Sequence, residues 1–253
     1  MGVIFTFFST NLLLAQDPII SPPPCIGNEC TDLVWHYDSM TVFPGNINQN
    51  IDSNCSVRLY YKEAYGCGKC YIYITAYKLR FCPTITVSKS IIINYSIACY
   101  LLQANQITNG LKCVPTITNP CVNNIRIFSG SCKQEFNYYN TPGHDPNGNS
   151  VAFVTDYNPW NLVGPTPNLI PILPGEKVYI NCSPTCCKAT FNFCAFWNQE
   201  QTKVIYTISP ILDQQTLPDC SNSIPNNTLV TNPCVPDCWF SDSSFTFKSP
   251  YYN

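Results

Sequence analysis

The most regular alternation of apolar and polar residues in this chain runs from Cys55 to Cys82. Residues 57–62 and 71–81 both have a period of two and are rich in aromatic and β-branched side chains, which is typical of strands. Gly66 and Gly68 lie between them, and cysteines stand at both strand ends and at the turn. The pattern predicts a β-hairpin closed by covalent bridges.

Further alternating segments predict more strands along the chain. They are residues 33–43, 124–128, 150–155, 177–182, 188–196 and 203–209, and the pair 177–182 and 188–196 has the form of a second hairpin. Residues 88–105 differ, because Ile91, Tyr95, Ala98 and Leu102 recur at three- and four-residue spacing. With a serine cap at the start and Asn109-Gly110 at the end, they predict one helix.

The predicted fold class is mainly β: a disulfide-rich, antiparallel, β-sandwich-like architecture with one minor helix. Residues 137–174 are rich in Asn, Pro and Gly and divide the chain. They predict an irregular connection between a cysteine-rich module at 17–136 and another at 175–253. One continuous domain over 17–253 is the alternative.

Composition places the chain outside the cell. Only 11% of its residues are charged and its net charge is −2, with no run of Lys and Arg of the kind that nucleic acid or an anionic membrane attracts. Residues 1–16 are apolar and of the length of a secretory signal peptide, although the usual basic start is missing. After this segment no stretch has the ~20 apolar residues of a transmembrane helix. We expect a secreted or cell-surface protein.

The chain has 17 cysteines, all after residue 16. In an oxidising compartment such a set forms disulfides, and the odd number leaves one thiol free, modified or paired with another chain. The neighbours Cys186 and Cys187 should reach different partners, since adjacent strand residues point to opposite faces. Short Cys spacings would also suit zinc, but secretion favours bridges. The structural disulfide candidates are Cys55, Cys67, Cys70, Cys82, Cys182, Cys186, Cys187, Cys194, Cys234 and Cys238.

Catalytic patterns are weak. The two histidines are His36, within a predicted strand, and His144, in the irregular segment, and neither adjoins a recognisable nucleophile motif. We expect a protein that is not an enzyme, with a secreted hydrolase as a second alternative function.

One segment has the spacing of a calcium loop. Asp145, Asn147, Asn149 and Asp156 occupy positions one, three, five and twelve, but position six is Ser150 instead of glycine and the last ligand is Asp. We expect no cofactor here and keep calcium as an alternative to a plain turn.

Aromatic residues offer a further binding hypothesis. Trp160 and Tyr157 lie in the irregular segment, where an exposed ring could contact a sugar, whereas Trp35, Trp197 and Trp239 are expected in the core. The function predicted is that of a disulfide-stabilised structural or interaction protein, adhesive or part of an extracellular assembly. The alternative is a carbohydrate- or peptide-binding accessory module. Expected partners are an extracellular protein, a glycan or a second copy of the chain, and not nucleic acid.

Overall fold

The protein is described here from a computed structural model. It describes residues 30, 33–84, 86–107, 115, 120–141, 147, 152–155, 169–197, 204–212, 220, 232–238 and 245–248. In this part of the chain the strands are β1 (His36–Val42), β2 (Ser56–Gly66), β3 (Lys69–Arg80), β4 (Cys121–Gly130), β5 (Cys132–Asn137), β6 (Ala152–Thr155), β7 (Leu169–Ile172), β8 (Glu176–Asn181), β9 (Cys186–Trp197), β10 (Val204–Leu212), β11 (Cys234–Pro236) and β12 (Phe245–Lys248). The helices are α1 (Lys89–Ile107) and the short 3-10 turns η1 (Pro44–Asn46) and η2 (Tyr138–Asn140).

The predicted central hairpin is confirmed. β2 and β3 pair in antiparallel fashion along their whole length, from Ser56 opposite Arg80 to Gly66 opposite Lys69. The turn uses two residues with positive φ, Cys67 at 51° and Gly68 at 70°. Two-residue hairpin turns of this kind match the twist of the strands that they join.

The predicted helix is also confirmed, as α1. Its first turn is capped by the hydroxyl of Ser88, which accepts a hydrogen bond from Ile91 N at 3.4 Å. Ile91, one of the residues whose spacing predicts the helix, is itself 42% exposed. Ile92, Ile93 and the apolar residues from 97 to 102 are buried instead, as expected for a helix enclosed on most sides.

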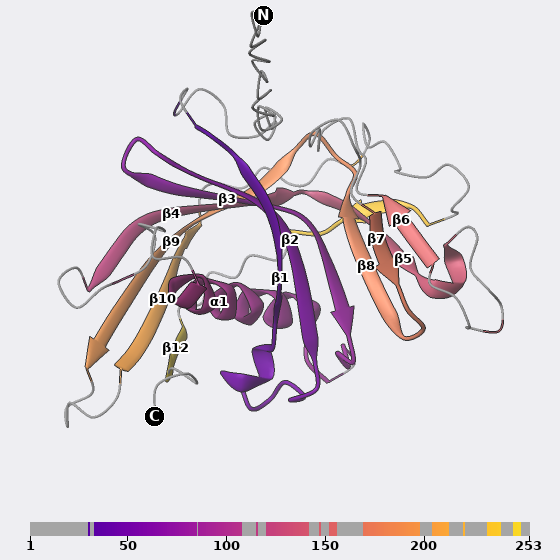
Figure 1. The fold of residues 1–253 in the computed structure, drawn as a ribbon, viewed down its shortest axis with the longest axis horizontal. Coiled ribbons are helices and arrows are strands. Elements are labelled where there is room, and N and C mark those ends of the chain that lie inside the picture. The colour runs from indigo at the N-terminus through magenta and orange to yellow at the C-terminus, as the bar shows by residue number, and fades with distance from the viewer. Residues whose placement is uncertain are drawn as a thin grey trace, which may run out of the picture.

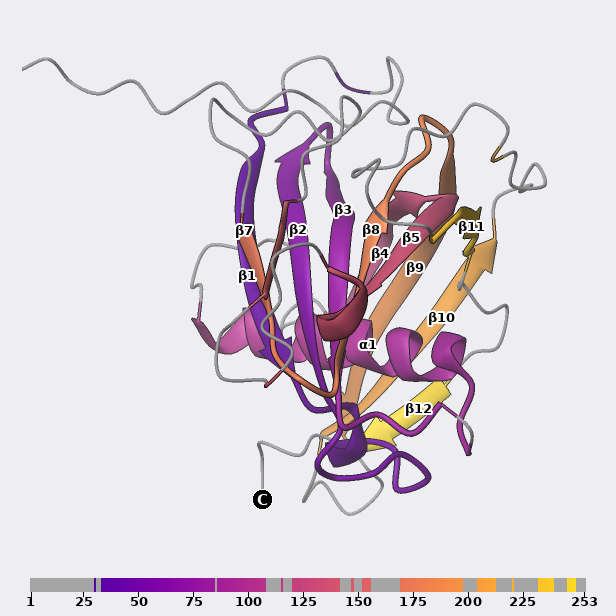
Figure 2. The ribbon, with the colours of Figure 1, turned by 90° about the vertical axis from the view of Figure 1, so that its right-hand side faces the viewer.

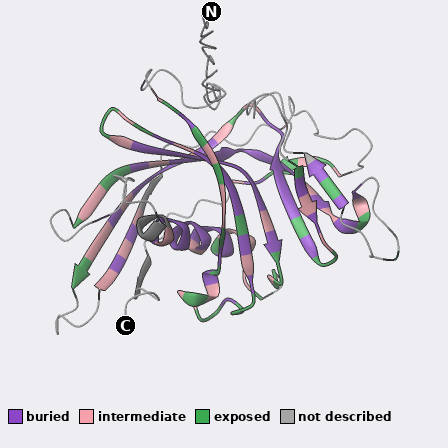
Figure 3. Cartoon of the chain, viewed as in Figure 1, coloured by how far each residue is buried: buried purple, intermediate pink, exposed green. Residues whose placement is uncertain are grey.

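α1 connects β3 to β4, and these two strands run parallel. The sheet is therefore mixed, and the prediction of a purely antiparallel architecture is wrong in this respect. The two strands are parallel because the helical crossover returns the chain to the end of the sheet at which β3 began. Figure 1 shows α1 lying across the concave side of the curled sheet. Figure 3 shows its described turns largely buried there.

The sheet branches along β3. Residues 70–74 pair with β4, whereas residues 76–80 pair with β8 on the same edge. Thr75 lies at the branch point, and on the other edge the register with β2 shifts between Tyr60 and Tyr61. The strand order through the branch is β11-β5-β8-β3-β4-β9-β10-β12, and β2 with β1 lies on the other side of β3.

Side chains complete the hydrogen bonding at this branch. Asn181 donates through Nδ2 to the carbonyl oxygen of Ile74 at 2.7 Å and to Tyr73 Oη at 3.2 Å. Thr75 Oγ1 donates to the carbonyl oxygen of Tyr60 at 3.1 Å. Gly130 is needed beside them, since a Cβ at residue 130 would lie 2.7 Å from the Asn181 side chain. Buried main-chain carbonyls must find donors, and the branch supplies them.

The second predicted hairpin is wrong in its pairing, although its strands exist. β8 pairs with β3 and β5, and β9 pairs with β4 and β10, so that β3 and β4 lie between β8 and β9. Local alternation predicts a strand but does not identify its neighbour. One sheet contains strands from residues 36–137 and from residues 176–248. The division of the chain into two modules stays a prediction.

Buried side chains cover both faces of the sheet. The largest cluster joins α1 to the concave face of β2, β3, β4, β9 and β10. A second cluster lies on the other face, where the small hairpin β6–β7 covers β8, and Tyr60, Ala76 and Val178 belong to it. Figure 2 shows β7 on that side of the sheet. The mainly β, disulfide-rich fold with one helix is thus confirmed.

Candidate functional site

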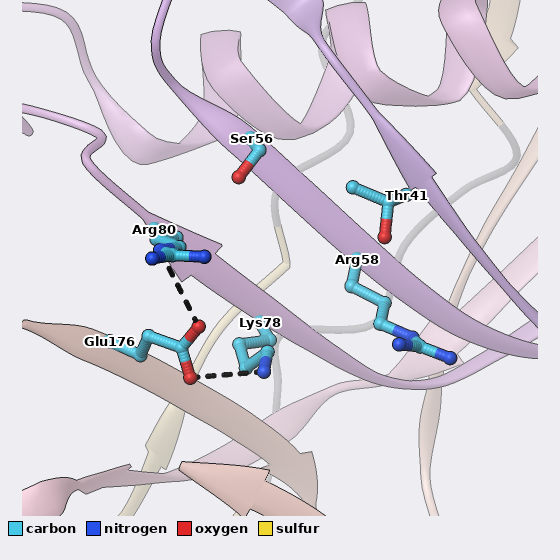
Figure 4. Close-up of a pocket in the computed structure, with 6 residues that line it drawn as sticks. All are labelled: Thr41, Ser56, Arg58, Lys78, Arg80 and Glu176. Atoms are coloured by element: carbon cyan, nitrogen blue, oxygen red, sulfur yellow. Dashed lines mark hydrogen bonds and ion pairs between the residues drawn. The ribbon is translucent and has the colours of Figure 1, made fainter. Parts of the chain in front are cut away.

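A polar pocket of about 160 Å³ lies next to β7, where one of its lining residues, Lys78, donates to the carbonyl oxygen of Pro171. Four strands supply its lining, and Figure 4 shows the side chains that face it. The lining residues are Thr41 from β1, Ser56 and Arg58 from β2, Lys78 and Arg80 from β3, and Glu176 from β8.

Strand register brings these residues together. Thr41 lies opposite Arg58, and Arg58 lies opposite Lys78. In the next row Ser56 lies opposite Arg80, and Arg80 lies opposite Glu176. Residues two apart on a strand share a face, so the two rows form one surface. The second row exists only because the branch at Thr75 places β8 beside this half of β3.

Glu176 orders the inner wall of the pocket. Its carboxylate is 3% exposed and accepts from Lys78 Nζ at 3.0 Å and from the main-chain N–H of Leu173 at 2.8 Å. Arg80 Nε lies 3.9 Å from its other oxygen. Lys78 also donates to the carbonyl oxygen of Pro171 at 3.1 Å. A buried carboxylate needs partners of this kind, and they hold two cations in place.

Arg58 is positioned on the opposite wall without a carboxylate partner in the pocket. It donates through Nε at 3.2 Å and Nη2 at 2.8 Å to Ser39 Oγ. Its guanidinium also lies 5.6 Å from the centroid of the Tyr60 ring. Three cationic side chains face one carboxylate, so the pocket has an excess of two positive charges in a chain whose net charge is −2. Such a surface attracts anions.

The Cys55–Cys82 bridge joins the chain just before β2 to the chain just after β3, next to the paired residues Ser56 and Arg80, with 4.5 Å between the two Cα atoms. Phe81 precedes Cys82, is 59% exposed and has a φ of 54°. A bulky residue in the left-handed region is a genuine outlier, and such residues concentrate at functional sites. The Arg80 guanidinium lies 4.9 Å from the centroid of the Phe81 ring.

A second ionic cluster is buried on the opposite face of the sheet, at Tyr77, the neighbour of Lys78 on β3. Asp237 lies 2.8 Å from Lys89 Nζ and 3.6 Å from Lys133 Nζ, and it accepts from the Tyr77 hydroxyl at 2.5 Å. The pKa of Lys133 is lowered to about 8, mainly by burial; Asp237 opposes this shift and Lys89 adds to it. Burial acts to raise the pKa of Asp237, but Lys133 and Lys89 outweigh it and hold that pKa below its usual value.

This cluster closes the C-terminal segment onto the sheet. Lys133 also donates to the carbonyl oxygens of Gly130 at 3.0 Å and Asp237 at 2.9 Å, so its ammonium is fully occupied by the protein. Two bridges flank Asp237, Cys182–Cys234 and Cys187–Cys238. The arrangement is that of a structural clamp, because its groups satisfy one another and leave little for a ligand.

Disulfides account for the predicted cysteine set. The remaining described pairs are Cys30–Cys67, Cys121–Cys194 and Cys132–Cys220, and Cys70 and Cys186 are bridged as well. Cys186 and Cys187 do have different partners, as predicted. So many bridges indicate an oxidising environment.

Cys99 is a free thiol, and it is buried in α1. Its Sγ donates to the carbonyl oxygen of Phe43 at 3.5 Å, and burial raises its pKa to about 12. Among the described cysteines, none is therefore free and exposed for an intermolecular disulfide.

Most of the other predicted site residues lie outside the described residues. Residues 1–16, Tyr157, Trp160, His144, Asp145, Asn149 and Asp156 belong to that group, while Asn147 is described as an exposed turn residue. Within the described ranges, no group of three or more His, Cys, Asp or Glu residues is arranged to hold a metal.

Of the tryptophans and histidines that are described, Trp35 is buried as predicted, and His36 is exposed on β1. Trp197 is 54% exposed, so its predicted core position is wrong: it ends β9 beyond the buried stretch. No described helix is long and apolar enough to cross a membrane.

The basic pocket could not be found as a run of basic residues along the chain, because Arg58, Lys78 and Arg80 meet across strands. Their signal was present as the polar positions of the central hairpin, which register alone brings side by side. Comparison with known protein families, characterised proteins and solved structures finds no match to this chain.

Proposed function

We propose that this chain is a secreted or cell-surface interaction protein that binds an anionic group of its partner in the pocket between β1, β2, β3 and β8. The observation that carries the proposal is the excess of two positive charges among ordered side chains. Lys78 and Arg80 are held by Glu176, and Arg58 is held by Ser39, so binding costs little side-chain ordering. Adhesion or assembly at the cell surface is the role that such a site would serve.

The hydrogen-bonding capacity of Arg58 supports this proposal. Ser39 accepts from the N–H of Nε and from one N–H of Nη2, which leaves three of the five guanidinium N–H groups for a ligand. Guanidinium groups bind carboxylate, sulfate and phosphate oxygens with paired hydrogen bonds. Thr41 and Ser56 add hydroxyl groups that donate or accept.

The proposal is tested by replacing Arg58→Gln and measuring binding to three immobilised anionic polymers: poly-L-glutamate, polygalacturonate and dextran sulfate. Lys177→Gln is the matched control, because it removes the same charge from an exposed residue that lies outside the pocket and pairs with Glu135. We expect Arg58→Gln to weaken binding about tenfold, and the control to change it little.

Binding by the unaltered chain should also weaken as salt is raised, since the pocket's charges are partly exposed. The proposal fails if none of the polymers binds, or if Arg58→Gln and Lys177→Gln reduce binding equally. Circular dichroism of both variants confirms that each is folded.

A further inference from the structure

The size of the pocket limits what it can enclose. Its volume of about 160 Å³ is well below the ~300–1,000 Å³ of sites that enclose a whole drug-sized ligand. It accommodates one ionic group and the ring or side chain that bears it. A ligand larger than this must place one unit in the pocket and extend across the surface with the rest.

Phe81 adds an apolar surface next to this ionic site. Its ring is 59% exposed and stacks with Arg80, which lines the pocket. The left-handed backbone at Phe81 is maintained between Arg80 at the end of β3 and the bridged Cys82. Asparagine or glycine would adopt this conformation more readily. An exposed ring in a conformation unfavourable to it suggests that the ring is retained for a contact.

The full set of groups matches an acidic sugar better than an acidic peptide. Cations recognise the carboxylate or sulfate, the hydroxyls of Thr41 and Ser56 suit sugar hydroxyls, and the Phe81 ring suits the apolar face of a pyranose. An acidic side chain in a peptide would use the cations but would not need the exposed ring. This inference rests on the proposed function, since it names the ligand of the same pocket.

We propose that the pocket binds an anionic sugar residue of an extracellular polysaccharide, with its acid group among Arg58, Lys78 and Arg80 and its ring against Phe81. Carboxylated and sulfated sugars share this chemistry, and polygalacturonate and dextran sulfate distinguish the two sources. Poly-L-glutamate represents an acidic peptide, and neutral dextran represents a sugar without charge.

The decisive variant is Phe81→Asn, with Phe153→Asn as its control, because Phe153 is 52% exposed on β6 and does not line the pocket. We expect Phe81→Asn to weaken binding to at least one acidic polysaccharide about fivefold and to leave poly-L-glutamate binding unchanged. Its thermal midpoint should stay the same or rise, because asparagine relieves the unfavourable φ. A ring with a purely structural role would instead lower the midpoint when removed.

The outcomes separate this inference from the function on which it depends. If poly-L-glutamate binds as tightly as the polysaccharides and Phe81→Asn changes nothing, the sugar assignment is overturned while the anion site stands. If neutral dextran binds as well as the charged polymers, the assignment is likewise overturned. If Arg58→Gln affects no polymer, the anion site itself is wrong.

Discussion

Replacing Asp237 by Asn tests the buried ionic clamp. The substitution removes the negative charge that faces Lys133, Lys89 and the Tyr77 hydroxyl, at 3.6, 2.8 and 2.5 Å. Lys133 has a fully buried side chain, so its ammonium would remain without a counterion. Breaking a buried pair on one side is strongly destabilising for this reason.

The magnitude follows from the pKa of Lys133. That pKa is lowered to about 8, so at pH 7 the amine can lose its proton in the variant at a cost of about 1.4 kcal/mol. Losing the charged hydrogen bonds from Lys89, which is partly exposed, and from Tyr77 costs about 2 kcal/mol more. We therefore expect Asp237→Asn to reduce the free energy of unfolding by about 3–4 kcal/mol at pH 7.

The penalty should depend on pH in a defined direction. In the unfolded chain Lys133 keeps its proton up to the ordinary lysine pKa of 10.5, whereas in the folded variant it loses the proton below the pKa of about 8. A folded state that binds fewer protons gains stability as pH rises. In the variant the free energy of unfolding begins to rise at a lower pH than in the unaltered chain. The stability difference between the two proteins therefore shrinks between pH 6 and pH 8, by at most about 1.4 kcal/mol per pH unit.

Urea unfolding with the disulfides intact, followed by circular dichroism at pH 6 and pH 8, measures this difference. The double variant Lys133→Met/Asp237→Asn is the control, and it should recover part of the loss because neither charge is then buried alone. A penalty below about 0.5 kcal/mol, or one that is equal at both pH values, would show that Lys133 does not depend on Asp237 as a counterion.

Three further predictions concern stability and reactivity. Burial raises the pKa of Tyr73, Tyr77 and Tyr100 above the usual 10.0. The stability they contribute is complete below pH 10 and is lost as pH rises toward their folded values. These three groups contribute about 4 kcal/mol per pH unit to the slope of alkaline unfolding, and Tyr61 and Tyr179, whose pKa values are also raised, make it steeper. We expect the loss of circular dichroism to coincide with the ionisation of these buried tyrosines. Ionisation of all the tyrosines near pH 10 while the circular dichroism stays native would contradict it. Gly130→Ala should destabilise by about 1–3 kcal/mol in urea unfolding, because its Cβ would overlap the Asn181 side chain; an unchanged midpoint would show that the branch adapts. Cys99 should resist thiol reagents at pH 8 until the protein unfolds, since it is buried with a pKa of about 12. Peptide mapping of the labelled protein tests this, and rapid labelling in the native state would show that α1 opens.

Local features of the fold could be predicted from the sequence. The β2–β3 hairpin follows from alternation on both sides of a glycine-containing turn, and α1 follows from its spacing and its serine cap. These signals lie within a few residues of one another. They depend on backbone conformation and burial, which the local pattern reports.

Long-range pairing could not be predicted. β8 and β9 are neighbours in the sequence but are separated in the sheet by β3 and β4. The branch depends on Thr75, Asn181 and Gly130, which meet only in the folded sheet. The bridge pattern has the same origin, since Cys132 and Cys220 are 88 residues apart.

The candidate site shows the same limit. Arg58, Lys78 and Arg80 were visible as polar positions of the hairpin, but their joint charge depends on register and on the arrival of Glu176 from β8. The exposed Phe81 carried no signal, because its positive φ is not encoded by residue type. Binding residues contributed by separate strands become evident only when the pairing is known.

The anion site is best probed by a nuclear magnetic resonance titration of the side-chain N–H groups with two short oligomers, one of galacturonate and one of glutamate. If the pocket binds anions, the resonances of Arg58 and Arg80 shift in a saturable manner with at least one oligomer, while the signal of Lys177, which lies outside the pocket, stays in place. If the arginine signals do not move with either oligomer, or if Lys177 shifts equally, the pocket is not an anion-binding site.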